Sequence, residues 1–286
     1  MFRKIFFFVF ITFSFFRGAA QLSGEGYIHA SEIGIGLGAA HYFGDLNPYE
    51  KLNRPKIAIG AFYQYYFNNY VSAKVSGNFA QLGYSDMYSS NPVYRARNLS
   101  FNTNIWELTV SGSFHFLNYM PGIDGHNFTP YVSLGAGIFS YNPYAYLNGQ
   151  KVYLRPLGTE GQNSNGKYAG KKYGSIAGTF PLSLGVKYAL NQKWAVFAEA
   201  GYRFTTTDYI DDVSTVYAGA NAFAPGVYKG SAAQAQLALQ LQDRSLNGIG
   251  TPGMQRGNNT SSKDSYIIGQ VGVSFNFTNC NCPRVH

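Results

Sequence analysis

Apolar and polar residues alternate in a segment close to the end of the chain, residues 265–277. From Ile267 to Phe277 every second residue is apolar or glycine, and most of the residues between them are small or polar. Side chains of a strand point alternately to its two faces, so the segment predicts a strand with one apolar and one polar face. Such a strand could also close a soluble sandwich, and the rest of the chain decides between the two.

Seven further segments show the same alternation, and each predicts a strand. They are residues 33–43, 56–66, 71–84, 101–116, 129–141, 179–190 and 193–205. The connections after the second, fourth and sixth segments are short or moderate, whereas most of the others are longer. A membrane barrel has short turns at one rim and long loops at the other. We therefore predict an all-β fold, an eight-stranded antiparallel up-and-down transmembrane β-barrel with long extracellular loops and short periplasmic turns.

Charged residues inside the predicted strands all lie on the polar face. They are Lys56, Lys74, Glu107, Lys187, Glu199 and Arg203. A soluble barrel of the lipocalin kind has the reverse arrangement, with apolar residues inside and charges outside. We therefore expect the apolar face to contact lipid and the charges to point into the lumen.

The lumenal charges need partners, because breaking a buried pair leaves an uncompensated charge at a cost of about 3–5 kcal/mol. The interior of an eight-stranded barrel is just wide enough for side chains to fill. We therefore expect a packed polar core and a plugged barrel rather than a pore. The predicted network consists of Lys74, Glu107, Lys187, Glu199 and Arg203.

The first residues have the pattern of a secretory signal. Arg3 and Lys4 precede an uncharged run from Ile5 to Phe16, and the small residues 18–20 follow it. A transmembrane helix needs about 20 apolar residues, so this run is too short to be one. We expect residues 1–20 to be a cleaved signal peptide, residues 21–277 to form the outer-membrane barrel domain, and residues 278–286 to form a periplasmic tail, with both ends of the mature chain in the periplasm.

Composition supports a barrel and argues against other classes. Aromatic residues make up 17% of the chain and charged residues 13%, as expected of strands whose rings form girdles at the membrane interfaces. Mean hydropathy is −0.15 and no later segment has a long apolar run, which excludes a helical membrane protein. The net charge of +8 comes from scattered basic residues without a nucleic-acid motif, so we expect no binding to nucleic acid.

Candidate chemistry in the sequence is sparse. It contains no Gly-x-Ser-x-Gly, His-Glu-x-x-His or Cys-x-x-Cys motif. His41, near the outer end of the first strand and on its lipid-facing side, is where a lipid-cleaving histidine would lie, although such a histidine far more often anchors the rim. The acidic cluster Asp208–Asp212 offers carboxylates for calcium, but such clusters more often cap or solvate a loop. We expect no catalytic residue, no cofactor and no metal.

Two features mark the end of the chain. Residues 270–277 fit the pattern polar-x-Gly-x-x-apolar-x-aromatic, which resembles the C-terminal insertion signal of bacterial outer-membrane barrels. Its residues are Gln270, Gly272, Phe275 and Phe277. Beyond the strand, Cys280 and Cys282 form a C-x-C tail. These cysteines are free thiols, a local disulfide, or a bond or metal link to a partner protein.

Two motifs carry a family resemblance. The segment Gly44–Pro48 follows the first strand, and Thr207–Ser214 follows the seventh. Both resemble signatures of a family of Bacteroidetes outer-membrane β-barrels, the DUF6089 type, which includes PorG of the type IX secretion system. The resemblance extends over essentially the whole mature chain. Its motif residues here are Gly44, Asp45, Leu46, Asn47, Asp208, Tyr209, Asp211 and Asp212.

The resemblance implies a non-enzymatic component of the type IX protein secretion and gliding machinery. Such a barrel is expected to anchor a periplasmic ring, built with a lipoprotein, to the outer membrane. The contact would lie on the periplasmic rim, and in an oxidising periplasm the tail cysteines could cross-link to a ring subunit. The expected contact residues are Asn68, Asn69, Pro121, Gly122, Asp124, Asn191, Gln192, Lys193, Cys280 and Cys282.

Two other functions remain open at this stage. The chain could be an OmpA-like barrel whose outer loops, rich in tyrosine and asparagine, bind a surface or membrane-protein partner. It could also be a lipid-modifying enzyme that depends on His41. Apart from the ring proteins, the candidate partners are outer-membrane lipids and other outer-membrane proteins. Within the longest loop, residues 232–244 predict a short helix.

Overall fold

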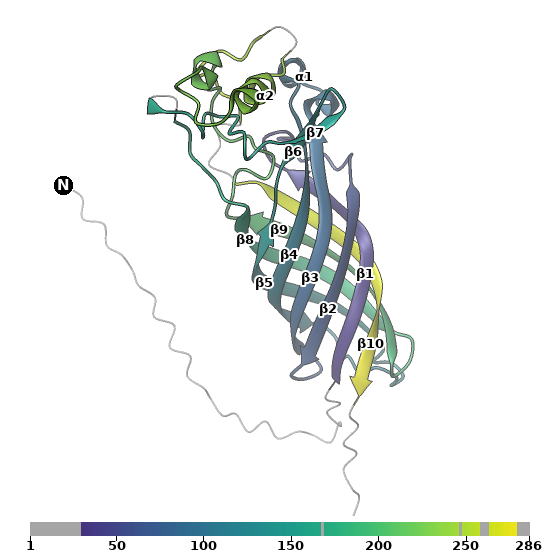
Figure 1. Cartoon of the computed structure of the whole chain (residues 1–286). Helices are drawn as coiled ribbons and strands as arrows, with labels where there is room; N and C mark the ends of the chain where they lie inside the picture. Colours follow the sequence, from purple (N-terminus) through teal and green to yellow (C-terminus); the bar gives the residue numbers. More distant parts are fainter. Residues whose placement is uncertain (1–29, 167–168, 246–247, 258–262, 279–286) are drawn as a thin grey trace, which may run out of the picture.

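Eight long antiparallel strands close into a barrel (Figure 1). The structure, a computed structural model, describes residues 30–166, 169–245, 248–257 and 263–278. The barrel strands are β1 (Ala30–Phe43), β2 (Lys56–Tyr66), β3 (Val71–Ser85), β4 (Ser100–His115), β5 (Phe128–Ser140), β8 (Ile176–Ala189), β9 (Trp194–Thr205) and β10 (Ser265–Thr278). β10 pairs with β1, with Ile35 opposite Val273, and this pairing closes the cylinder. The predicted fold class is confirmed, and the predicted strand ends lie within three residues of the observed ones.

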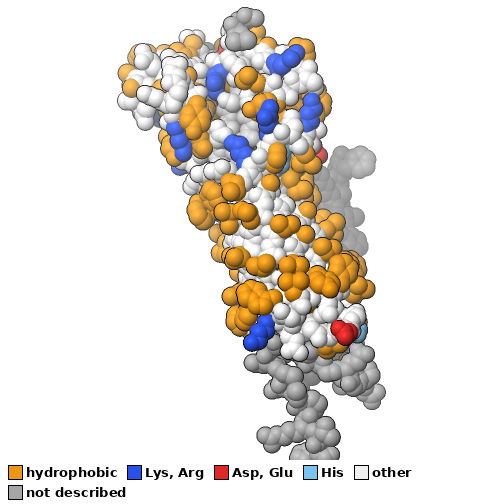
Figure 2. Space-filling model, turned by 90° about the vertical axis from the view of Figure 1, so that its right-hand side faces the viewer, with side chains coloured by type: hydrophobic (Ala, Val, Ile, Leu, Met, Phe, Trp, Pro, Cys, Tyr) orange, Lys and Arg blue, Asp and Glu red, His pale blue; other side chains and the backbone are white. Residues whose placement is uncertain are grey.

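The outer wall of the barrel is apolar. Ile35, Leu134 and Val271 are 64%, 66% and 64% exposed, and apolar side chains cover the wall in Figure 2. Their sequence neighbours, of opposite parity, point into the lumen and are largely buried. A wall of this kind is stable when lipid replaces water around it, because burial of apolar surface contributes about 25 cal/mol per Å². The barrel is therefore of the kind that spans a membrane.

Glycines on the inner face make room for large rings in the lumen. Phe62 and Phe197 meet edge to face there, with ring centroids 5.2 Å apart. A Cβ atom on Gly34 would lie 2.5 Å from the ring of Phe62, and one on Gly272 would lie 2.7 Å from the ring of Phe197. The alternation of glycine with apolar residues in β1 and β10 thus reflects the narrow interior of the barrel.

The long loops fold together at one end of the barrel, and we call this part of the molecule the cap (Figure 1). It contains η1 (Asp86–Tyr88), α1 (Pro92–Arg97), the hairpin of β6 (Tyr144–Leu147) and β7 (Gln150–Tyr153), η3 (Ala220–Phe223) and α2 (Ala232–Gln242). A capping box of Ser231 and Gln234 begins α2, which confirms the helix expected in this loop. Among the described residues, no helix is long and apolar enough to cross a bilayer.

The cap and the adjoining strand ends share one apolar core. Leu46 comes from the β1–β2 connection, Ile210 and Leu241 come from the β9–β10 connection, and each is at most 1% exposed. They belong to the same cluster as Tyr42 of β1 and Tyr266 of β10. The cap is consequently packed onto the barrel, and it covers that end of the lumen.

The lipid-facing wall gives a direct test of membrane insertion. Val110 lies on the outer face of β4, midway between the outward rings of Trp106 and Phe114. Replacing it by arginine should reduce the free energy of unfolding in vesicles by about 2–4 kcal/mol, because the charge would lie near the bilayer midplane. The matched substitution Val93→Arg, at an exposed position of α1, should change the stability little. Urea titration followed by gel migration measures both, and equal costs at the two positions would contradict a lipid-embedded wall.

Candidate functional site

A buried ion pair lies in the lumen near the rim of short turns. Lys187 pairs with Glu32, and the two side chains are at most 1% exposed. The Lys187 ammonium also donates hydrogen bonds to the hydroxyl of Tyr66 at 2.9 Å and to Oε1 of Gln64 at 3.2 Å. The partner of Lys187 is therefore Glu32, and neither Glu107 nor Glu199. The sequence prediction omitted Glu32 because it began the first strand at Ile33, whereas the observed strand begins at Ala30 and includes Glu32.

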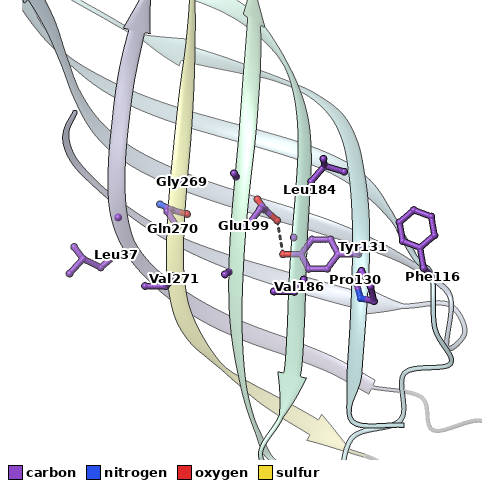
Figure 3. A pocket seen from close by; sticks show the side chains of 14 residues that line it. Leu37, Phe116, Pro130, Tyr131, Leu184, Val186, Glu199, Gly269, Gln270 and Val271 are labelled. Atoms are coloured by element: carbon purple, nitrogen blue, oxygen red, sulfur yellow. Dashed lines mark hydrogen bonds between the residues drawn. The ribbon is translucent and has the colours of Figure 1, made fainter. Parts of the chain in front are cut away.

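A second ion pair joins Lys74 of β3 to Glu199 of β9 across the lumen. The hydroxyl of Tyr131 donates a hydrogen bond to Glu199 at 2.9 Å, which Figure 3 shows as a dashed line. With this donor and the ammonium of Lys74, the buried carboxylate has two partners. The charges are thereby compensated in a part of the lumen that offers them little water.

The third lumenal pair joins Arg203 to Glu107, with 3.5 Å between Nε and Oε2. Glu107 also accepts hydrogen bonds from the hydroxyl of Tyr266 at 2.6 Å and from the amide of Asn78 at 2.8 Å. The structure thus brings together the five predicted network residues with Glu32 as three pairs. They connect strands that are far apart around the barrel and fill its interior.

An aromatic layer closes the lumen at the rim of short turns. Tyr119 lies in the connection between β4 and β5, yet it folds back into the barrel and is buried. Its ring stacks on His115 at 6.1 Å, and His115 also contacts Tyr131 at 5.5 Å. Tyr66, Tyr119, Ala189 and Ala195 form a small apolar cluster at this end. The barrel is therefore closed here by side chains, and at the other end by the cap.

A hollow of about 650 Å³ lies on the barrel wall and not in the cap (Figure 3). Exposed apolar side chains such as Leu37, Leu184 and Val271 form its outer part. The carboxylate in its lining, Glu199, is already paired with Lys74. The chemistry of this hollow suits lipid chains rather than a reacting substrate.

His41 does not face lipid, contrary to the sequence prediction. It is 3% exposed, because the connection after β1 folds back so that Arg54 contacts it, and the rings of Phe43 and Tyr84 lie beside it. Its Nε2 accepts a hydrogen bond from the backbone N–H of Arg54 at 3.1 Å, and its Nδ1 lies 2.9 Å from the carbonyl of Tyr42. Both ring nitrogens thus form hydrogen bonds with backbone groups, so neither is available for acid–base chemistry.

The two family motifs, which lie far apart in the sequence, meet beneath the cap. The hydroxyl of Tyr42 approaches Asp211 at 2.6 Å and Asp264 at 3.0 Å. The amide of Asn47 donates to the carbonyl of Tyr42 at 3.0 Å, and Leu46 is fully buried. The motif residues therefore join the first and last long loops to the end of β1.

Two buried arginines tie the remaining loops together, and the sequence prediction included neither. Arg97 donates two hydrogen bonds to the carboxylate of Asp86, at 2.8 and 2.7 Å, and a third to the carbonyl of Arg256 at 2.6 Å. Arg256 itself lies 3.2 Å from Glu160 and donates to the carbonyl of Asp212 at 2.7 Å. Arg97 also donates to the carbonyl of Asp45 at 3.0 Å, so the guanidinium groups supply donors for backbone and carboxylate oxygens of four loops.

The Asp208–Asp212 segment is committed to hydrogen bonds within the cap. Asp212 accepts from the hydroxyls of Thr159 and Tyr173, and Asp208 accepts from Ser214 at 2.7 Å. In the part of the chain that the structure describes, no three or more His, Cys, Asp or Glu side chains are arranged to hold a metal ion. The carboxylates therefore act in this structure as acceptors that fold the loop.

Burial perturbs the carboxyl groups of the cap. It raises the pKa of Asp211 and Asp264 well above their ordinary range, and the neighbouring acidic groups, including Asp45, add to the effect. Burial also raises the pKa of Asp212 from 3.8 to about 6, although Arg256 opposes the shift. The cap consequently takes up protons at mildly acidic pH.

The predicted contact residues lie at the rim of short turns. Oδ1 of Asn68 accepts hydrogen bonds from two backbone N–H groups, both at 2.8 Å, and Asn191 does the same in its own turn. A Cβ atom on Gly122 would lie 2.2 Å from the side chain of Gln192, so the connection at Pro121–Asp124 packs against that turn. The other contact residues at this rim are Asn69 and Lys193. Cys280, Cys282 and the predicted signal peptide lie outside the described residues.

The residues of the predicted insertion signal divide between the two faces of β10. Phe275 and Phe277 point outward, with ring centroids 5.3 Å apart. Gln270 and Gly272 point inward, and the amide of Gln270 lies 3.4 Å from Oδ1 of Asn78. The aromatic rings are thus at the lipid-facing surface near the rim of short turns.

Comparison with known proteins gives a family match and several structural likenesses. Residues 3–221 match the family described as "Domain of unknown function (DUF6089)". None of the curated proteins matches the chain. It is similar to the N-terminal β-barrel domain of OprF from Pseudomonas aeruginosa, with 12% identity, a TM-score of 0.36, and coverage of 88% of this chain and 100% of that one. It is also similar to Ail from Yersinia pestis, with 13% identity, a TM-score of 0.39, and coverage of 87% and 99%.

Removing one partner of the most buried lumenal ion pair, Lys187 with Glu32, should reduce stability strongly. Glu32→Gln leaves the buried ammonium of Lys187 without a counter-charge, so the free energy of unfolding in vesicles should fall by about 3–5 kcal/mol. The double variant Glu32→Gln/Lys187→Met should recover part of the loss, and Glu50→Gln, an exposed carboxylate in the cap, should cost almost nothing. Equal stabilities of the single variant and the Glu50→Gln control would contradict a paired lumen.

The cap should lose stability as pH rises. A carboxyl whose pKa is raised by folding binds its proton more tightly in the folded state, so stability is highest below the ordinary pKa and falls as pH passes the raised one. For Asp212, this window extends from 3.8 to about 6 and corresponds to a loss of roughly 3 kcal/mol. Protease resistance of the cap, measured from pH 4.5 to 7.5 in detergent, should decrease.

The substitution Asp212→Asn should weaken that pH dependence, while Asp124→Asn, an exposed carboxylate at the opposite rim, should leave it as it is. A cap whose protease resistance increases over this pH range would refute the sign of the effect.

Proposed function

Because the chain belongs to the DUF6089 family and has a lipid-facing barrel with a filled lumen, we propose that it is a non-enzymatic outer-membrane component that holds a protein assembly to the membrane. The assembly we propose is the periplasmic ring of the type IX secretion and gliding machinery, which includes a lipoprotein. In this proposal the cap is extracellular, and the rim of short turns and both ends of the mature chain are periplasmic.

The filled lumen is the observation that carries the proposal. Three ion pairs, the Phe62–Phe197 contact and the aromatic layer occupy the interior, and the cap lies over the other end. A barrel of this kind has no route for a solute along its axis among the described residues. It can therefore act through its rims and its outer wall.

The rim of short turns is suited to a permanent contact because it is rigid. The asparagine turns at Asn68 and Asn191 are fixed by hydrogen bonds to the backbone, and Gly122 packs on Gln192. A rigid surface loses little conformational entropy when a partner binds. Exposed Ile123, 39% accessible, adds an apolar contact among charged and polar neighbours.

The folded cap favours a second candidate function, recognition of a surface or membrane-protein partner. The abundance of tyrosines in the loops supports this recognition function only in part, because Tyr209, Tyr217 and Tyr228 are buried in the cap. Tyr146 and Tyr153 of the β6–β7 hairpin are 52% and 43% exposed. An ordered surface with exposed rings is a suitable binding surface.

Co-purification separates the two functions. The full-length protein is extracted from native membranes in mild detergent, and the proteins that accompany it are identified by mass spectrometry. The triple variant Ile123→Asp/Asp124→Lys/Lys193→Glu alters the rim of short turns, and we expect it to lose the periplasmic ring proteins. The decrease should exceed tenfold if these residues contribute about 1.4 kcal/mol or more to binding.

A matched control changes the cap in the same three ways, through Val93→Asp, Glu50→Lys and Lys229→Glu, all at exposed positions. It should retain the ring proteins. Loss of surface proteins from the control alone would favour the second function. Retention of the same partners by both variants, or absence of ring proteins from the unaltered complex, would refute the proposal.

A further inference from the structure

Two polar hollows lie side by side where the barrel wall meets the cap. The first has a volume of about 280 Å³, and its lining includes Trp106, Tyr144, Lys151, Tyr153 and Arg155. The second has a volume of about 340 Å³, and its lining includes Arg54, Lys56, Tyr84, Tyr88 and Asn102. Asn102 pairs with Tyr144 in the sheet, so the start of β6 connects the two hollows. No Asp or Glu lines either of them.

The outward face of β4 places these hollows at the boundary of the apolar wall. Leu108 and Trp106 are 55% and 65% exposed, and toward the cap the same face continues with the polar residues Asn104 and Asn102. Trp106 packs on Phe79 with ring centroids 4.8 Å apart. Tryptophan in membrane proteins is enriched at the level of the lipid headgroups. The hollows therefore open at headgroup depth.

The cations in the first hollow are held in place and lack a counter-charge. Lys151 lies 3.8 Å from the ring centre of Tyr144 and 4.8 Å from that of Tyr153. Within the described part of the chain, neither Lys151 nor Arg155 forms an ion pair, and Nε of Arg155 is buried without a hydrogen-bond acceptor. Buried polar groups are normally satisfied, so this donor lacks an acceptor that a ligand can supply.

The second hollow has the same chemistry. The guanidinium of Arg54 lies 4.0 Å from the ring centre of Tyr88. Lys56 donates a hydrogen bond to Asn102, a neutral acceptor that leaves its charge uncompensated. On the face seen in Figure 2, basic side chains are numerous over the capped end and acidic ones are scarce. Both hollows thus combine cations, aromatic rings and a position next to lipid.

We propose that the two hollows bind phosphate groups of an anionic lipid headgroup in the leaflet next to the cap, from a phosphorylated glycolipid of the lipid A class; this lipid class rests on the extracellular cap of the proposed function. Arg155 and Lys151 contact one phosphate, and Arg54 and Lys56 contact a second. The lining positions Asn102 and Trp106 are four residues apart on β4, or roughly 13 Å, a span that a bulky headgroup can bridge. Such binding fixes the height of the cap above the membrane.

Lipid titration of the full-length protein in detergent, followed by native mass spectrometry, tests this. The probes are bisphosphorylated lipid A, its monophosphorylated form, zwitterionic phosphatidylcholine and inorganic phosphate. We expect affinity to decrease in that order. For the unaltered protein, the affinity for bisphosphorylated lipid A should also decrease as salt rises from about 0.05 M to about 0.5 M. Equal binding of phosphatidylcholine, insensitivity to salt, or binding of inorganic phosphate as tight as that of lipid A would refute the proposal.

The variant Lys151→Gln/Arg155→Gln should bind bisphosphorylated lipid A roughly tenfold to a hundredfold more weakly, because it loses hydrogen bonds to a charged group. The control Arg95→Gln/Lys229→Gln removes the same charge from exposed positions outside both hollows and should bind as the unaltered protein does. Equal losses in the two variants would overturn the site. If the first variant does not fold, Arg54→Gln/Lys56→Gln provides the same test in the second hollow.

Discussion

An ion enclosed in a narrow barrel has little water to solvate it, and this constraint organises the molecule. Each lumenal carboxylate lies beside a cation from a different strand, as Glu32 lies beside Lys187 and Glu199 beside Lys74. The hydroxyls of Tyr131 and Tyr266 donate further hydrogen bonds to the carboxylates, and that of Tyr66 accepts one from Lys187, so the charges need no solvent. The same arrangement keeps these charges away from the apolar outer wall. Lys56, at the cap end of β2, is an exception to the expected lumenal placement, because its ammonium reaches Asn102 on the outer face of β4. A filled lumen and a lipid-facing wall are thus two results of one requirement.

The cap solves the same problem with guanidinium groups. Arg97 and Arg256 are buried. Arg97 donates to oxygens of three loops and Arg256 to oxygens of two, which lets long irregular segments pack with their carbonyl groups satisfied. The acidic side chains around Tyr42 are unfavourable in their ionised form, because burial raises their pKa values. The stability of the cap therefore depends on proton uptake, and the cap differs in this respect from the apolar outer wall of the barrel.

The alternation of residues was sufficient to predict the barrel, because strand parity is a local property and lipid imposes it on every strand. Pairing is a property of distant residues: Glu32 was missed as the partner of Lys187, and Arg97 and Arg256 gave no local signal. The β6–β7 hairpin does have a local sequence signal. This is the pair Asn148-Gly149, which favours a tight turn and has positive φ at both residues. His41 was misplaced because the parity of a strand says nothing about a loop that folds back over it.

The register of β1 against β10 has a consequence for how the protein forms. The first and last strands of the described chain are hydrogen-bonded over their whole length, from Ala30 opposite Thr278 to Phe43 opposite Ser265. Until the last strand has been synthesised, the cylinder has two bare edges, which are sites for pairing with other chains. Closing a loop of this length is entropically slow. The two edges therefore stay open to such pairing until the last strand meets the first along its whole length.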